Sequence, residues 1–274
     1  MSRNGVWRKY TSKGEIQIMK IAISGKGGVG KTTLSALLAQ VYADMGRNVL
    51  AADADPSPCL AGALGFPEEL RVQLHPIAEM DDLIEERTGA KPGTRGGFFT
   101  INPRVDDIPD RFSVTYRGVK LLEMGSVDLG GSGCICPESA MLKTLFTHLL
   151  FRDEDVLILD MYAGVEHLGR ATVDFVDAMI IVVEPTRRSL GTAAQIKQLA
   201  QDIGLSRFWL VGNKVRNAEE EVFLNAETPG IPLLGFLPAD LKVQEADRLG
   251  VPVYDHVPAL RAAAAQLAKA LDAR

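Results

Sequence analysis

The chain has 274 residues, with 30 Lys and Arg against 35 Asp and Glu, which gives a formal net charge of −5. Apolar residues make up 46% and charged residues 24%, and these values exclude a disordered, collagen-like or disulfide-scaffold protein. The mildly acidic balance argues against a general nucleic-acid binder, and no apolar run is long enough for a transmembrane helix. Three cysteines, two of them one residue apart, cannot form a disulfide framework and indicate a reducing, cytoplasmic setting.

Short apolar, β-branched runs alternate along the chain with stretches of helical period. The predicted strands are 20–24, 48–52, 119–124, 156–160, 178–184, 208–213 and 233–237. The predicted helices are 32–45, 139–150, 190–203, 242–249 and 258–273. This alternation predicts one α/β domain over residues 19–274, with a mostly parallel central sheet flanked by helices on both faces. Residues 1–18 are predicted to be a flexible N-terminal extension.

The segment 88–112 interrupts this alternation. It is rich in Gly, Pro, Arg and Asp, and we expect a long surface excursion there. Short strands are expected within or beside it, at 98–101 and 113–116. The residues from Tyr116 to Val119 predict a hairpin turn into the strand that follows.

A glycine-rich motif joins the first predicted strand of this domain to its first helix. The motif fits G-x-x-x-x-G-K-[ST], in which backbone N–H groups curl round phosphate oxygens at a helix N-terminus. Lys31 is predicted to reach the β- and γ-phosphates, and Thr32 is predicted to hold Mg²⁺. The predicted phosphate loop consists of Gly25, Lys26, Gly27, Gly28, Val29, Gly30, Lys31, Thr32 and Thr33.

Lys26 follows the first glycine, where an ordinary phosphate loop needs no lysine. The pattern K-G-G-x-G-K-[ST] resembles the deviant Walker A motif of the MinD/ParA/nitrogenase-iron-protein class. In that class, the equivalent lysine reaches across a face-to-face dimer to the partner's nucleotide. The resemblance implies a P-loop NTPase that uses ATP or ADP with Mg²⁺, and a homodimer in which Lys26 stabilises charge in trans. A solvated loop lysine is the alternative.

Carboxylates follow two predicted strands, at the edge where ligands bind in open α/β sheets. Asp160 ends an apolar strand and suits the Walker B role beside Mg²⁺. The resemblance implies that Asp55 orients or activates the attacking water. It also implies that Asp53 supports Mg²⁺ indirectly, by contacting the groups that coordinate the ion. Asp53 also fits a simple cap or turn residue.

Two further strand ends match the base-binding segments of the same class. Asn213 and Lys214 end one strand, and Pro238 follows the next. The resemblance implies that Asn213 hydrogen-bonds the adenine and that the Pro238 loop flanks the ring.

The segment Gly133–Glu138 (GCICPE) places two thiols on one short run. The glycines before it and Pro137 after it predict a loop that enters a helix, whose N-terminus lowers a thiol pKa. Two thiolates are too few for Zn²⁺ or Ni²⁺, whereas a two-fold dimer supplies four from Cys134 and Cys136. Two buried cysteines or a redox pair are the alternatives. The third cysteine, Cys59, is expected to be a packing residue.

Four segments narrow the resemblance to the CooC-type nickel-insertion ATPases of carbon monoxide dehydrogenase maturation. They are 102–109 (NPRVDDIP), 131–138 (GSGCICPE), 160–170 (DMYAGVEHLGR) and 184–190 (EPTRRSL). The resemblance covers essentially residue 19 to the C-terminus, and it departs from the family at Tyr162, where an acidic residue is expected.

This resemblance implies an ATP-dependent nickel metallochaperone with carbon monoxide dehydrogenase as its client. It further implies that Cys134 and Cys136 hold Ni²⁺, with Zn²⁺ possible at the same site, and that Glu166 contacts the partner subunit's nucleotide. For His167, a structural role is favoured over metal ligation. Delivery to acetyl-CoA synthase is an open alternative for the client.

Two other functions remain open at this point. A positioning ATPase of the MinD/ParA kind would carry a basic amphipathic anchor or a basic DNA-binding surface. The alanine-rich tail 262–270 is a poor anchor, so we expect no stable membrane anchor and no nucleic-acid partner. An iron–sulfur scaffold ATPase would hold a cluster on the same four cysteines.

Overall fold

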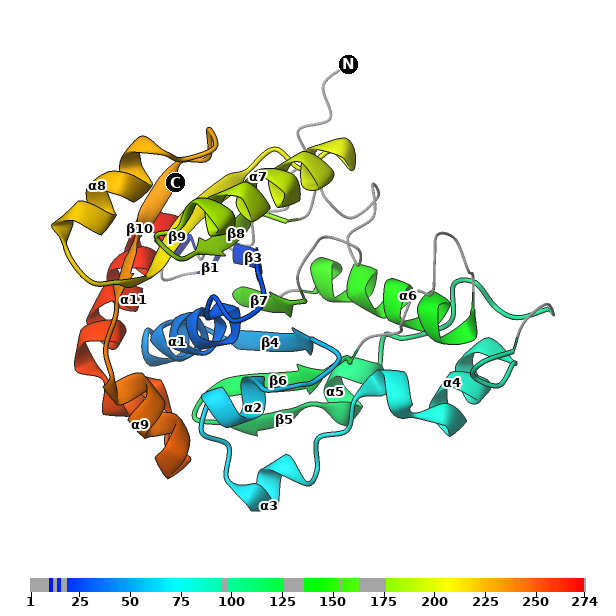
Figure 1. Cartoon of the computed structure of the whole chain (residues 1–274). Coiled ribbons are helices and arrows are strands. Elements are labelled where there is room, and N and C mark those ends of the chain that lie inside the picture. Colours follow the sequence, from blue (N-terminus) through cyan, green and yellow to red (C-terminus); the bar gives the residue numbers. More distant parts are fainter. Residues whose placement is uncertain are drawn as a thin grey trace.

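The computed structural model of the chain describes residues 10–11, 14–15, 19–94, 98–125, 136–152, 154–162 and 176–273. A sheet of eight strands runs through the molecule (Figure 1). Its strands are β3 (Met19–Gly25), β4 (Val49–Ala54), β5 (Val114–Tyr116), β6 (Val119–Glu123), β7 (Val156–Met161), β8 (Ala178–Val183), β9 (Phe208–Val215) and β10 (Leu233–Pro238). Their order across the sheet is β10-β9-β8-β3-β7-β4-β6-β5. All neighbours are parallel except β5 and β6, so the predicted mostly parallel sheet is confirmed.

Helices follow most of the strands. They are α1 (Lys31–Asp44), α2 (Leu60–Ala63), α3 (Glu68–Arg71), α4 (Asp81–Thr88), α5 (Ile108–Phe112), α6 (Pro137–Phe151), α7 (Arg187–Asp202), α8 (Ala218–Ala226), α9 (Lys242–Leu249), α10 (Val253–His256) and α11 (Pro258–Asp272), with a 3₁₀ turn at Ile77–Glu79. The five predicted helices are confirmed as α1, α6, α7, α9 and α11, with small shifts at their ends. The remaining helices were not predicted.

The sheet is buried on both faces, because consecutive strand residues enter two different cores. Ile21 and Ile23 of β3 pack in the core that also holds side chains of α1 and α11, whereas Ala22 packs with those of α6 and α7. The same alternation holds in β4, β7 and β8. The predicted placement of helices on both faces is therefore confirmed, and it explains the uninterrupted apolar runs of these strands.

The predicted hairpin joins β5 to β6. Tyr116 pairs with Val119, and the two residues between them have positive φ angles, 48° at Arg117 and 80° at Gly118. Two left-handed residues in a two-residue loop match the twist of an antiparallel pair, which confirms this turn.

The segment 88–112 differs from expectation in two ways. Phe98–Ile101 is not a strand, because Phe98 is 104% and Ile101 61% exposed and neither meets a sheet edge or a core. The segment is also not wholly a surface excursion, because Val105 and Ile108 are buried in the core beside α6.

The predicted N-terminal extension lies mostly outside the described residues. Within it, β1 (Tyr10–Thr11) and β2 (Gly14–Glu15) form a short antiparallel pair. No helix in the described parts of the chain is long and apolar enough to cross a membrane.

Candidate active site

The phosphate loop connects β3 to α1, as its sequence predicts. Its backbone requires glycine at two positions. A Cβ atom on Gly25, which has φ 153°, would meet the carbonyl oxygen of Val182 at 2.5 Å. A Cβ atom on Gly30, the N-cap of α1 with φ 96°, would meet the side-chain nitrogen of Asn213 at 2.1 Å. The loop therefore ends in a helix N-terminus of the kind that binds phosphate.

The two lysines of the loop lie in different environments. Lys31 is 8% exposed, and its Nζ atom lies 3.5 Å from the carbonyl oxygen of Lys26, so its ammonium group folds over the loop. The side chain of Lys26 is exposed. An exposed position suits a group that acts on a second subunit, although that role stays a prediction.

Asp160 lies at the carboxyl end of β7 and is 2% exposed. Its Oδ1 atom accepts a hydrogen bond from the hydroxyl of Ser35 at 3.1 Å, whereas its Oδ2 atom is buried with no hydrogen-bond partner. Burial and the charge of Asp53 raise the pKa of Asp160 to about 7, although the hydroxyls of Thr32 and Ser35 and the charge of Lys31 oppose the shift. An orphaned buried carboxylate oxygen beside a hydroxyl fits a Mg²⁺ site formed with Thr32. Ser35 was missed by sequence reasoning, although it lies three residues after Thr32 on one face of α1.

Asp53 organises the loop that follows β4. It is fully buried, and its Oδ1 atom accepts a hydrogen bond from the backbone N–H of Asp55 at 3.1 Å. Its Oδ2 atom accepts from the N–H groups of Cys59 and Leu60, both at 2.9 Å. Burial raises the pKa of Asp53, and these three bonds oppose the shift. Asp53 is also the register partner of Asp160 on the adjacent strand, which places it beside the proposed Mg²⁺ ligand.

Asp55 lies within the loop that Asp53 holds. It is half-buried, and its Oδ1 atom accepts a hydrogen bond from the N–H of Ser57 at 3.0 Å. Its role toward a water molecule stays a prediction.

A groove of about 780 Å³ opens beside the start of α1, between α2, α3, α9 and α10. Thr32 and Thr33 line it, and so does Cys59. Cys59 was expected to pack in the interior, and this expectation is wrong, because its side chain is exposed. The reason is that Cys59 is the N-cap of the short helix α2, where its thiol donates to the carbonyl of Ser57 at 3.2 Å and faces the groove.

Two of the predicted base-binding residues contact the phosphate loop. The Nδ2 atom of Asn213 donates to the carbonyl of Val29 at 2.7 Å. The Nζ atom of Lys214 donates to the carbonyl of Gly28 at 2.8 Å and to Oε1 of Glu184 at 2.6 Å. Glu184 was not predicted as a site residue. Pro238 ends β10, next to this part of β9.

Of the two predicted metal-binding cysteines, Cys136 is described and Cys134 lies outside the described residues, as do Glu166 and His167. Cys136 is half-buried and is the N-cap of α6, with Pro137 in the first turn, so the predicted entry into a helix is confirmed. The segment between α4 and α5 contacts this helix, because the N–H of Gly93 donates to Oε1 of Glu138 at 2.6 Å. Within the described residues, no group of three or more His, Cys, Asp and Glu side chains gathers to hold a metal ion.

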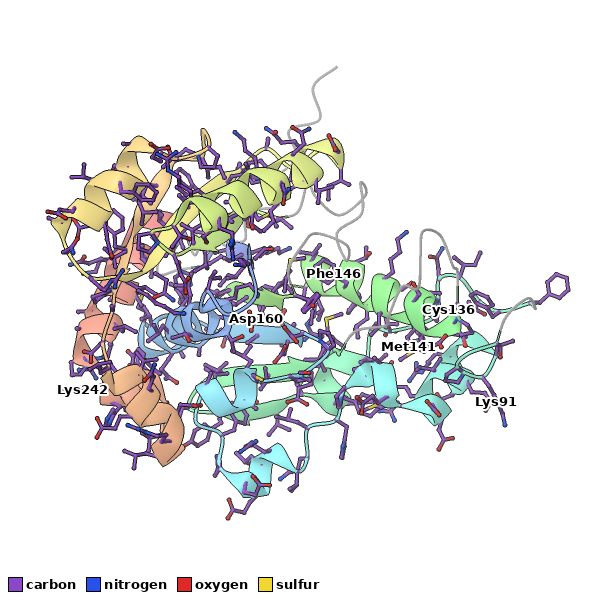
Figure 2. All side chains as sticks on the ribbon, viewed as in Figure 1. Lys91, Cys136, Met141, Phe146, Asp160 and Lys242 are labelled. Atoms are coloured by element: carbon purple, nitrogen blue, oxygen red, sulfur yellow. The ribbon has the colours of Figure 1, made fainter. Side chains whose placement is uncertain are left out.

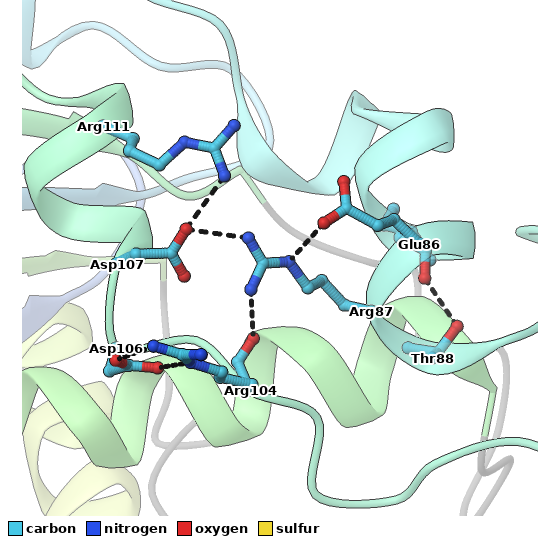
Figure 3. Close-up of polar contacts among 8 residues, drawn as sticks. Glu86, Arg87, Thr88, Arg104, Asp106, Asp107 and Arg111 are labelled. Atoms are coloured by element: carbon cyan, nitrogen blue, oxygen red, sulfur yellow. Dashed lines mark hydrogen bonds and ion pairs between the residues drawn. The ribbon is translucent and has the colours of Figure 1, made fainter.

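A charged network braces the two ends of that segment (Figure 3). Arg87 of α4 has a side chain that is only 10% exposed, and it pairs with Oδ2 of Asp107 at 2.8 Å. Arg111 pairs with the same oxygen at 2.9 Å, and Arg87 also donates to the carbonyl of Arg104 at 3.3 Å. The two guanidinium groups hold the pKa of Asp107 well below its usual range. Asp107 and Arg104 of this network belong to the 102–109 segment that carries part of the family resemblance.

Comparison with known proteins decides the family. The model of the CobQ/CobB/MinD/ParA nucleotide binding domain matches residues 20–253. The carbon monoxide dehydrogenase accessory protein CooC of Rhodospirillum rubrum is 47% identical over 92% of this chain and 96% of its own length. The chain is a CooC-type member of the MinD/ParA ATPase family. A further member, an uncharacterized ATP-binding protein of Methanocaldococcus jannaschii, is 46% identical over 86% of this chain and 91% of its own.

The family also has solved structures of the same fold. The septum site-determining protein MinD of Pyrococcus horikoshii, complexed with Mg-ADP, has a TM-score of 0.65 at 22% identity, over 93% of this chain and 96% of that one. Membership confirms the predicted P-loop fold and the ATPase class, with an adenine nucleotide as ligand, whereas Mg²⁺ stays a prediction for this chain.

Proposed function

We propose that this CooC-type ATPase is a dimeric metallochaperone that carries Ni²⁺ and supports nickel insertion into carbon monoxide dehydrogenase. The proposal draws the client from the name of the Rhodospirillum rubrum relative. It draws the cargo from Cys134 and Cys136, which supply two thiolates per subunit and four per two-fold dimer.

The observation that carries the proposal is the common edge of the sheet. The phosphate loop follows β3, Asp55 follows β4, Asp160 is the next-to-last residue of β7, and the chain that leads to Cys136 leaves β6. Because these strands are parallel, all four segments start from the same edge. Figure 2 shows Cys136 at the end of α6 that is remote from Asp160, so the proposed nucleotide and cargo sites are separate.

The nucleotide chemistry follows from the site. The loop N–H groups and Lys31 bind the phosphates, while Thr32 and Asp160 hold Mg²⁺, which screens the phosphate charge when bound. Asp55 positions the water that attacks the γ-phosphorus, and Lys26 stabilises the developing charge on the partner's nucleotide. Glu166 is proposed to contact the partner's nucleotide as well, and Pro238 to flank the adenine.

Coupling requires that nucleotide and metal favour the same conformation. Two subunits that close over the shared edge bring their thiolates together, and loss of the γ-phosphate loosens that arrangement. ATP can drive metal transfer only if the closed and open states differ in metal affinity. Nucleotide must therefore change the affinity for Ni²⁺.

The test is a titration of the anaerobic, reduced protein with Ni²⁺, with and without ADP or ATP, while light scattering follows the mass. We expect one Ni²⁺ per dimer, and loss of this binding in the Cys134→Ala/Cys136→Ala variant. Binding that survives in the variant refutes the shared thiolate site. A visible iron–sulfur absorbance after anaerobic purification supports the scaffold function instead.

A second variant separates the ATPase from the cargo site. Lys31→Ala is expected to abolish ATP turnover while leaving the four thiols intact. Unchanged turnover in this variant contradicts the assigned nucleotide chemistry, whatever the metal titration gives.

A further inference from the structure

We propose that Phe98 and Ile101 form an apolar contact with a second copy of this chain, beside the thiolates that the two copies share. The contact rests on the dimer proposed above, and it deepens that proposal because it names side chains outside the cysteine motif that hold the two copies together. Both residues belong to the uncharged run 98–103 (FFTINP), which lies between α4 and α5.

The run 98–103 exposes two large apolar side chains close together in the chain. Phe98 is 104% exposed, and Ile101, three residues later, is 61% exposed. One exposed apolar side chain is ordinary on a protein surface, whereas an exposed apolar patch marks an interaction site. Aromatic residues are enriched and charged residues are depleted at the centre of protein interfaces. The run therefore has the composition of an interface, and not that of a loop that faces only water.

Two hydrogen bonds attach this part of the chain to the helix that begins at the cargo cysteines. Before the run, the N–H of Gly93 donates to Oε1 of Glu138 at 2.6 Å, two residues after Cys136. Within the run, the carbonyl of Ile101 accepts from the hydroxyl of Thr144 on α6 at 3.5 Å. The segment is therefore attached to the first two turns of α6, next to Cys136.

The size of a stable interface brings the run within reach of a second copy. Thr144 lies eight residues after Cys136, which is about 12 Å along the helix. A stable interface buries about 800 Å² on each partner, which corresponds to a round patch about 16 Å in radius. A patch of this size, centred on thiolates that meet at a two-fold axis, includes Ile101. Because both copies use the same patch, Phe98 of one copy meets the equivalent apolar run on the other.

The run is held in place within its own subunit. The N–H of Thr100 donates to the carbonyl of Thr88, the last residue of α4, at 2.8 Å, which closes the chain between them into a loop. Next to this closure, Arg87 pairs with Asp107 and donates to the carbonyl of Arg104 (Figure 3). A surface fixed in this way loses little conformational freedom on association, so burial of its apolar side chains contributes directly to affinity.

The test measures the dimerisation constant of the full chain by sedimentation, under anaerobic, reducing conditions with saturating Ni²⁺ and ADP. Phe98→Ser is the main variant. Burial of one phenyl group is worth about tenfold in an association constant, and a two-fold dimer buries two, so we expect about a hundredfold weaker dimerisation. Phe98→Leu should recover most of the loss. At protein concentrations high enough to restore the dimer, Phe98→Ser should still bind one Ni²⁺ per dimer, because its cysteines are intact.

Two further variants test the position and the specificity of the contact. Ile101→Ser should weaken dimerisation in the same direction, by about tenfold, because this side chain is partly covered already in the single chain. Val222→Ser is the matched control: Val222 is 67% exposed on α8, which follows β9, and β9 and β6 lie near opposite edges of the sheet. The control should dimerise as the wild type does.

Wild-type dimerisation in Phe98→Ser, or an equal loss in Val222→Ser, refutes the contact. Urea unfolding of Phe98→Ser should match the wild type, and a clear loss of stability would show that Phe98 packs within its own chain, which also refutes the contact. Normal dimerisation with impaired nickel transfer to apo carbon monoxide dehydrogenase would assign the run to the client and overturn the contact between copies. A wild type that stays monomeric with Ni²⁺ would instead refute the shared thiolate dimer, and the contact with it.

Discussion

Replacing Asp160 by asparagine is expected to stabilise the protein without Mg²⁺ and nucleotide, and to abolish ATP hydrolysis. Asp160 is 2% exposed, and one of its oxygens has no hydrogen-bond partner. Its carboxylate is therefore costly to the folded protein until a cation binds it. Asparagine keeps the shape and can still accept the hydrogen bond from Ser35, but it has no charge to offer Mg²⁺.

The magnitude follows from the pKa of Asp160, which burial and the charge of Asp53 raise from 3.8 to about 7. At about 1.36 kcal/mol per pH unit, the difference corresponds to about 4 kcal/mol against the charged, folded form. The variant also removes the attraction between Asp160 and Lys31, which offsets part of this gain. We therefore expect a net increase of about 2–4 kcal/mol in the unfolding free energy. Because the pKa is higher in the folded state, the penalty in the wild type is absent at low pH and grows as the pH rises from about 4 to about 7.

The assay is urea unfolding in EDTA, at several pH values between 5 and 8, for the wild type and the Asp160→Asn variant. The stability difference should be less than half of its full size at pH 5, increase toward pH 7 and level off above it. Asp82→Asn, at an exposed position on α4, is the control and should differ from wild type by less than about 0.5 kcal/mol at every pH. A variant that is less stable than wild type at pH 8, or a difference that does not change with pH, would refute the reasoning.

Three further outcomes are expected. Arg87→Ala should lower the unfolding free energy by about 2 kcal/mol in urea unfolding, because it removes a largely buried guanidinium that pairs with Asp107, whereas Arg104→Ala, at a side chain 77% exposed, should leave it nearly unchanged. Gly30→Ala should weaken ADP binding at least tenfold in calorimetry, because its Cβ would lie 2.1 Å from a buried amide nitrogen, whereas Gly191→Ala, on α7 with no atom within 4 Å of the added Cβ, should bind ADP within about threefold of wild type. Phe146→Ala should cost about 3–5 kcal/mol by the same urea assay, because this side chain of α6 is 1% exposed; a loss below about 1 kcal/mol would contradict its place in the core.

The sheet could be predicted because the residue pattern of its strands reflects their burial in the folded protein. In β7, both faces are buried, and the sequence is apolar at consecutive positions up to Asp160. The helix α8 lacked such a signal: its first turn carries three consecutive glutamates, and of its side chains only Leu224 is buried. The strand predicted at 98–101 was wrong for the opposite reason, because Phe98 is apolar and yet packs against nothing in the core. Apolar character predicts structure only where another element covers it.

The residues of the candidate site also fall into two groups, those that the sequence predicts and those that only the fold reveals. The phosphate loop is a local pattern, so its glycines and Lys31 could be read directly from the sequence. The contacts of Asn213 and Lys214 with the loop could not, because they join residues far apart in the chain. They depend on a one-residue register shift in β9 that no composition or periodicity encodes. Ser35 is intermediate, since helix spacing places it near Thr32 but only the fold brings Asp160 to it.

The carboxylates of Asp53 and Asp160 explain why a cation bound at the site is expected to stabilise the loop that follows β4. Asp53 and Asp160 are register partners on adjacent strands, and each raises the other's energy when both are charged. The two carboxylate oxygens of Asp53 accept hydrogen bonds from three backbone N–H groups between Asp55 and Leu60. One carboxylate oxygen of Asp160, in contrast, has no hydrogen-bond partner. A divalent cation at Asp160 relieves the repulsion, favours the charged form of Asp53 and thereby strengthens its bonds to that loop. In the proposed site, we therefore expect binding of Mg²⁺ to be linked to ordering of the loop that carries Asp55, through a single pair of neighbouring strands.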